Sequence, residues 1–268
     1  MRSLETINPE GMRPSRFVSF ASMVSATVIL ICLPLAWGAT GDTSFFDNLV
    51  VRLLLMMLTI CILLSIFSVA FRWDWRASYF GVPMICIASV SLIALVPFLS
   101  ILIFGNLTIW VNVLLIFGYA VSHIWWCRKF VTIYKDIFNH LESRGILYEE
   151  DADAVYYKRD GDNLLLAQYN FSQMPPSRYF LIFIILGFAL IPSIGVVKNI
   201  SGMPFAHVFL AVSMLPVSWM SIGLAVRGFL ICYYYPAQIK ALTGKTVYVD
   251  LTSKKRKQKS RQGPKNPH

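Results

Sequence analysis

Long apolar runs are the feature of this sequence that most restricts its fold. A bilayer core about 30 Å thick is crossed by a helix of about 20 apolar residues, and lipid itself offers the backbone N–H and C=O groups no hydrogen-bond partner. Only 14% of the residues are charged, against roughly 25% in soluble chains. The sequence therefore predicts an all-α polytopic membrane protein with about six transmembrane helices in three hairpins: 17–39, 49–71, 82–104, 107–126, 180–197 and 205–226.

The positive charges predict how these helices are oriented. Segments 1–16, 72–81, 127–179 and 227–268 carry 3, 2, 7 and 10 of the 24 Lys and Arg residues, which leaves only Arg52 and Lys198 elsewhere. Such asymmetry is typical of loops that stay in the cytoplasm. We expect a multi-pass protein of a bacterial cytoplasmic (inner) membrane with both termini cytoplasmic. Its predicted parts are an N-terminal tail (1–16), a four-helix transmembrane region (17–126), a cytoplasmic insertion (127–179), a transmembrane hairpin (180–226) and a basic tail (227–268).

The insertion begins with an amphipathic pattern. Apolar residues recur at helical spacing from Phe130 to Leu141, with charged residues between them, which predicts a helix with one apolar stripe. Without Pro or Gly from Tyr119 to Arg144, the fourth transmembrane helix is expected to continue into the cytoplasm and end before Gly145. A helix that bends at Cys127 and lies flat on the headgroups is the alternative.

The second half of the insertion suggests a small β structure. Asp160-Gly161 is a favoured two-residue hairpin turn, and Val155–Tyr157 and Leu164–Leu166 would be its strands. Because an isolated hairpin is marginal in water, it needs a partner. The strand-like segment 245–251 of the tail could supply a third strand.

These apolar faces must be covered, either by the tail or by another protein. We expect partner proteins, or further copies of this chain, to dock there, because 53 residues are few for a self-sufficient core. The predicted docking residues are Ile133, Tyr134, Ile137 and Phe138 on the helix and Tyr156, Tyr157, Leu164 and Leu166 on the hairpin.

The basic tail is interpreted as a membrane contact. From residue 227 onward ten cations accompany the single acid Asp250, and juxtamembrane cations are drawn to anionic headgroups. An acidic protein surface and nucleic acid are the alternatives. No nucleic-acid partner is expected, because the basic run lacks the interleaved aromatics of such arms. The predicted lipid-binding residues are Lys254, Lys255, Arg256, Lys257, Lys259 and Arg261.

Three polar residues in the predicted spans are the remaining candidates for chemistry. Arg52 is expected to pair with Asp47, Asn112 to hydrogen-bond between helices, and His123 to be a packing residue. Transport or catalysis would need the three to face one cavity. The histidines show no metal-ligand spacing and the chain has no catalytic motif, so we expect no cofactor, metal or catalytic residue.

The functional prediction follows from these patterns. We expect a non-catalytic integral inner-membrane subunit of a larger assembly, of the secretion, conjugation or envelope-complex type, that docks partners through its insertion. A transporter or channel for ions or small molecules, or a membrane-embedded enzyme, is the alternative.

Overall fold

A computed structural model describes residues 14–39, 44–71 and 73–250. Within these residues six helical segments are long and apolar enough to cross a membrane, which confirms the prediction of a multi-pass membrane protein. They are Ser15–Gly38, Leu49–Ala70, Ala77–Phe104, Ile109–Asn139, Ser177–Ser201 and Leu215–Thr243. The sixth differs from the prediction, since the helix breaks at Met214 and continues well beyond residue 226.

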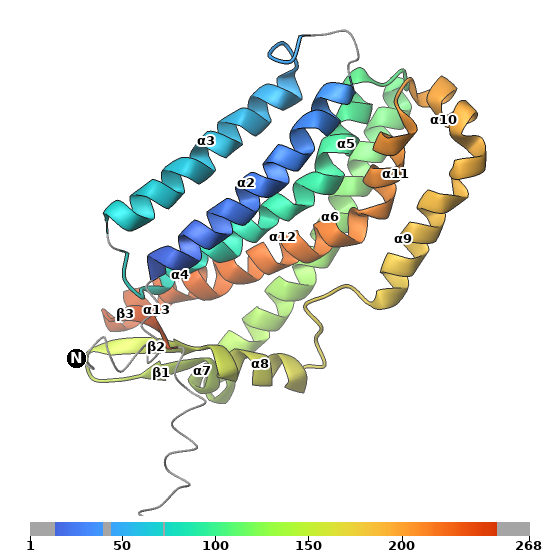
Figure 1. Ribbon diagram of the computed structural model, residues 1–268. Helices are drawn as coiled ribbons and strands as arrows, with labels where there is room; N and C mark the ends of the chain where they lie inside the picture. The colour runs from blue at the N-terminus through green and yellow to red at the C-terminus, as the bar shows by residue number, and fades with distance from the viewer. Residues whose placement is uncertain (1–13, 40–43, 72, 251–268) are drawn as a thin grey trace, which may run out of the picture.

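The helices form one elongated bundle (Figure 1). Its elements are α2 (Pro14–Gly38), α3 (Leu49–Ala70), α4 (Ala77–Cys86), the 3-10 helix η1 (Ile87–Ser91), α5 (Leu92–Phe104), α6 (Ile109–Asn139), α9 (Ser177–Ala189), the 3-10 helix η2 (Ile191–Ser193), α10 (Ile194–Ser201), α11 (Phe205–Ser213) and α12 (Leu215–Phe229). α2 packs along α3, whereas α12 packs against α4, η1 and α6, and α11 against α5 and α9. The last helices therefore insert between earlier ones, which three independent hairpins would not do.

α6 continues past Cys127 into the region outside the bundle, as predicted, but it ends earlier than Arg144. It stops at Asn139, because His140 adopts an extended backbone (φ −90°, ψ 116°) and its ring bonds the carbonyl of Asp136. A short helix α7 (Leu141–Leu147) then turns back, so the predicted helix end at Gly145 is wrong and Gly145 lies inside α7.

The predicted hairpin at Asp160-Gly161 is also wrong. The hairpin joins β1 (Tyr148–Glu150) to β2 (Ala154–Lys158), and the predicted second arm is the helix α8 (Arg159–Gln168). Asp160 and Asp162 lie in the first turn of α8, where carboxylates are favoured. Gly161 is there for close packing, because a Cβ would lie 2.1 Å from the carbonyl oxygen of Ile146.

The third strand suggested by the tail is present. α12 runs through the π-helix η3 (Leu230–Tyr234) into α13 (Tyr235–Thr243), and β3 (Thr246–Asp250) follows. In the described residues one three-stranded sheet has the order β1-β2-β3, with β1 and β2 antiparallel and β2 and β3 parallel. We call α7, α8 and the three strands (141–168 and 246–250) the sheet domain. The chain's own C-terminal strand therefore helps to close this domain.

Candidate functional site: a buried charge cluster and two cavities

The most unusual feature of the interior is a charge cluster where the sheet domain meets the bundle. Arg227 of α12 and Asp162 of α8 form an ion pair whose side chains are 9% and 0% exposed. Tyr134 of α6, Tyr157 of β2 and Gln173 of the following loop complete what we call the Arg227 cluster. Three stretches far apart in the sequence, α6, residues 157–173 and α12, thus meet in one buried network.

The hydrogen bonds of the Arg227 cluster leave its charged groups well partnered. Tyr134 and Tyr157 each donate their hydroxyl to Asp162, at 2.7 and 2.6 Å. Arg227 donates to Asp162 at 2.5 Å, to the Tyr134 hydroxyl at 2.9 Å and to Gln173 at 2.6 Å. A buried ion pair is tolerated only when further hydrogen bonds satisfy both ions. The cluster meets that condition and fixes the sheet domain to α12.

The tyrosines of this junction are held in their protonated form. Burial and then the negative charge of Asp162 raise the pKa of Tyr157 well above 10.0. Burial likewise raises the pKa of Tyr148, whose hydroxyl donates to the carbonyl of Ile231 at 2.8 Å. Both hydroxyls therefore act as donors rather than as bases at neutral pH.

Most of the predicted docking residues lie inside the chain's own core. Tyr134, Ile137, Tyr156, Tyr157 and Leu166 are buried, and Ile133 and Phe138 are partly buried against the same core. Phe138 stacks on Tyr235 of α13 at 4.2 Å between ring centroids. Only Leu164, which is 51% exposed, presents a free apolar side chain. These apolar side chains were predicted to contact a partner, but α13 and β3 of the same chain cover them instead.

His123 belongs to a second polar cluster, inside the bundle. Its Nδ1 lies 2.8 Å from the carbonyl oxygen of Tyr119 and its Nε2 2.8 Å from Oγ of Ser218. A carbonyl only accepts, so Nδ1 carries the proton and Nε2 of the neutral ring accepts from Ser218. The Tyr119 hydroxyl lies 3.1 Å from the same Ser218 oxygen. His123 thus joins α6 to α12, in line with a packing role.

The other two intramembrane candidates lie elsewhere. Arg52 pairs with Asp47 at 3.2 Å near the start of α3, as predicted, and its side chain is 62% exposed. Asn112 does not form the expected bond between helices through its oxygen, because Oδ1 has no hydrogen-bond partner in the described part of the chain. Neither residue meets His123, and none of the three lines either cavity described next.

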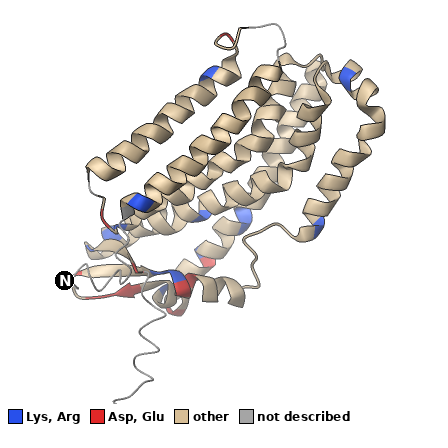
Figure 2. Ribbon diagram, viewed as in Figure 1, with Lys and Arg blue, Asp and Glu red and all other residues tan. Residues whose placement is uncertain are grey.

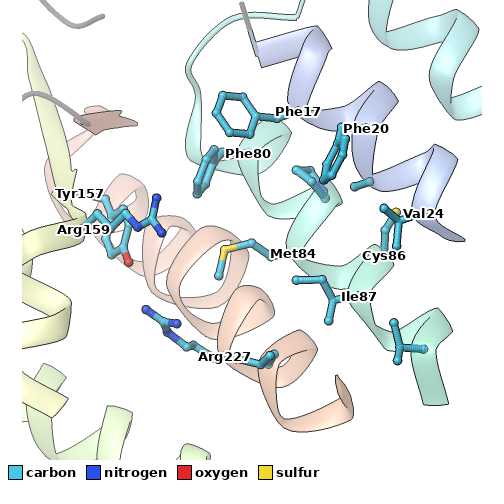
Figure 3. A pocket seen from close by; sticks show the side chains of 14 residues that line it. Phe17, Phe20, Val24, Phe80, Met84, Cys86, Ile87, Tyr157, Arg159 and Arg227 are labelled. Carbon is cyan, nitrogen blue, oxygen red and sulfur yellow. The ribbon is translucent and has the colours of Figure 1, made fainter. Parts of the chain in front are cut away.

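A cavity of about 380 Å³ lies between α2, α4 and α12 at the end of the bundle that carries the sheet domain. Figure 3 shows Arg159 and Arg227 at one side and apolar side chains of α2 and α4 at the other. A larger cavity of about 660 Å³ lies between α5, α6 and the α9–α11 helices, and it is lined almost wholly by apolar residues. Neither cavity was predicted from the sequence, because each is lined by residues of helices that are far apart along the chain.

Charged side chains are concentrated at the sheet-domain end of the molecule (Figure 2). The predicted lipid-binding residues 254–261 lie outside the described residues. Asp162 and Arg227, the most deeply buried ion pair described, were missed by sequence analysis.

Comparison of the chain with family models, curated proteins and solved structures found no match.

Proposed function

We propose that the protein is a non-catalytic subunit of a larger assembly in a bacterial inner membrane, and that its sheet domain is the cytoplasmic docking platform. The observation that carries the proposal is the Arg227 cluster. Its buried polar groups are engaged in attaching the sheet domain to the last transmembrane helix. A platform held in a fixed orientation is what an assembly subunit needs.

The docking surface of the proposal is the outer side of α7 and α8, which pack on each other. Leu141 at the start of α7 is 84% exposed and Leu164 of α8 is 51% exposed. Apolar side chains presented on rigid helices are suitable anchors for a partner. The partner role thus moves from the buried residues that the sequence indicated to the outward face of the same insertion.

Co-purification tests the proposal. The full-length protein is isolated in mild detergent and its partners are identified by mass spectrometry after cross-linking. Leu164→Asp should abolish the cross-links and fail to complement a deletion strain. The matched control Leu242→Asp, at a residue of α13 that is 72% exposed, should behave as wild type. A protein that runs alone, together with full complementation by Leu164→Asp, contradicts the proposal.

The proposed orientation has a separate test. Reporter fusions after Asp47, Glu150 and His268 should give an external signal for the first and a cytoplasmic signal for the other two. A cytoplasmic signal after Asp47 would reverse the assignment of the sheet domain.

One observation favours a membrane-embedded enzyme as the second candidate. Ser218 and His123 have the spacing of a nucleophile and its base, and a carbonyl holds the required tautomer. Tyr119 of the same cluster lines the larger cavity, whose lining is almost wholly apolar. A serine-directed fluorophosphonate probe tests it: labelling of wild type that Ser218→Ala removes would support this candidate over the first.

A further inference from the structure

The cavity beneath the sheet domain combines two surfaces that seldom occur together. One wall carries the guanidinium groups of Arg159 and Arg227 beside the Tyr157 ring, and the opposite wall is formed by Phe20, Val24 and Ile87 (Figure 3). A ligand that fills it must therefore be anionic at one end and apolar at the other.

The charge at the polar end is positive. The charge of Arg227 is balanced by Asp162, as described above. Arg159 is exposed, and the described residues give it neither an ion pair nor a hydrogen bond. One uncompensated cation therefore borders the cavity, and a guanidinium is the side chain best suited to bind a phosphate oxygen.

The apolar end faces the hydrocarbon of the bilayer. Phe20 and Val24 belong to the span Ser15–Gly38, and they are 69% and 39% exposed. Phe17, one turn earlier, packs edge-on against Trp75 at 6.0 Å between ring centroids, and tryptophan favours the headgroup layer. The cationic end thus lies at headgroup depth and the apolar end one or two turns deeper.

We infer that this cavity binds an anionic phospholipid, with the headgroup phosphate at Arg159 and the upper part of one acyl chain against α2 and η1. A volume of about 380 Å³ suits part of an amphiphile rather than a protein helix. The bound lipid would touch α2, α12 and α8 together, so it would reinforce the junction that the Arg227 cluster forms. This inference does not depend on the proposed partner role.

Native mass spectrometry of the full-length protein tests it. The probes are phosphatidylglycerol, phosphatidylcholine with the same acyl chains, and glycerol phosphate as a headgroup without chains. All variants carry glutamine at the six basic positions of residues 254–261, so that the tail contributes no cations. We expect phosphatidylglycerol to bind with a defined stoichiometry and phosphatidylcholine to bind at least about fivefold more weakly, the factor that about 1 kcal/mol per cation corresponds to. Glycerol phosphate keeps the anion but lacks the acyl chains, so it should also bind more weakly than phosphatidylglycerol.

Two variants with matched controls separate the two ends of the cavity. Arg159→Gln should weaken phosphatidylglycerol binding about fivefold or more, whereas Arg178→Gln, at an exposed cation in the first turn of α9, should not. Ala21→Trp should fill the cavity and abolish binding, whereas Ile31→Trp, at a position of α2 that is 54% exposed, should not.

Several outcomes would overturn the inference. They are equal binding of phosphatidylcholine, equal binding of glycerol phosphate, or wild-type binding by both Arg159→Gln and Ala21→Trp. If one variant does not fold, the other variant and the comparison of lipid classes decide.

Discussion

Two regions attached to α11 and α12 are held in opposite ways. At the sheet domain, Arg227 of α12 meets Tyr134 of α6 and the buried groups of residues 157–173. In the span Leu215–Thr243, 61% of the apolar 18-residue stretch is buried. The arm formed by α9 and α10 lies at the edge of the bundle (Figure 1). In its span Ser177–Ser201 only 6% of the apolar 18-residue stretch is buried.

The difference follows from what can hold helices together in lipid. Burying apolar surface gains little there, so close packing and hydrogen bonds have to supply the attraction. The arm makes few close contacts of this kind. Phe183 packs edge-on against Trp219, and Phe188 packs edge-on against Phe209. The 660 Å³ cavity lies between the arm and α6. We therefore expect the α9–α10 arm to separate from the rest of the bundle more easily than any other part. The sheet domain, which the Arg227 cluster attaches to α12, should separate least easily.

Removing Asp162 should have the largest effect. Asp162→Ala leaves Arg227 buried without its counter-ion, which costs roughly 3–5 kcal/mol. We expect denaturant unfolding followed by near-UV circular dichroism to show loss of the sheet domain's packing. Asp136→Ala, at an exposed residue of α6, is the control and should be silent. The double variant Asp162→Leu with Arg227→Met should recover part of the loss, and a double variant as unstable as Asp162→Ala would argue against an electrostatic cause.

Adding one methyl group to α12 should have the next largest effect. A Cβ at Gly223 would lie 2.5 Å from the ring of Phe130 and 2.6 Å from Nε1 of Trp126. Gly223→Ala should therefore push α12 from α6 and cost about 1–3 kcal/mol, as overpacking does.

Gly195→Ala in the arm is the matched control, because a Cβ there meets nothing within 4 Å. Both variants are compared by thermal unfolding in the same detergent. Because alanine favours a helix more than glycine does, Gly195→Ala should be neutral or slightly stabilising. Equal destabilisation by the two variants would show that contact with α6 does not decide the result.

The sequence predicted the bundle better than the junction, for a physical reason. Length and apolarity of a span are local properties, so the six spans are recognisable one by one. Asp162 and Arg227 are 65 residues apart, and in sequence Asp162 is one of several acids in a polar stretch. Nothing local indicates that it is the one enclosed by two tyrosines.

The predicted hairpin failed for a related reason. Asp160-Gly161 has the composition of a tight turn, but glycine also permits close packing, and only tertiary structure shows which property is used. Here the α7 backbone at Ile146 lies against Gly161, and Asp160, which was read as a turn residue, lies in the first turn of α8. The strand 246–250 was recognisable because strand-forming residues, β-branched or aromatic, follow one another from Thr246 to Val249.

Tyr157→Phe should have a smaller effect than the first two changes, and one that depends on pH. The variant loses the donor that bonds Asp162 at 2.6 Å, while Tyr134 and Arg227 still bond that carboxylate. The loss should therefore cost only about 0.5–1.5 kcal/mol. The pKa of Tyr157 is raised above 10.0 by burial and by Asp162. A raised pKa stabilises the fold below the unfolded value of about 10, and this contribution is lost as the pH rises further. Wild type should therefore lose stability above pH 10, and Tyr157→Phe should lose less over the same range. Parallel alkaline unfolding curves would contradict this assignment.

The smallest effect is expected from the pair of Lys245 and Glu150, which offers the sharpest comparison with Asp162. Its nitrogen and oxygen lie 2.8 Å apart and it too joins the C-terminal segment to the sheet domain, but the Glu150 side chain is 57% exposed. The hydrogen bond from Lys245 and then its charge lower the pKa of Glu150 below 4.5. The small contribution of such an exposed pair is therefore present above pH 4.5 and is lost as the pH falls through the lowered value. Water solvates either ion when the pair breaks, and Lys245 still bonds the carbonyl of Asp151 at 2.9 Å. Glu150→Gln should consequently leave thermal unfolding at pH 7 unchanged within error. If Glu150→Gln destabilised the protein as much as Asp162→Ala does, burial could not explain why the two ion pairs differ in their contribution to stability. The contrast between the buried Arg227 cluster and the solvated pair of Lys245 and Glu150 would then be wrong.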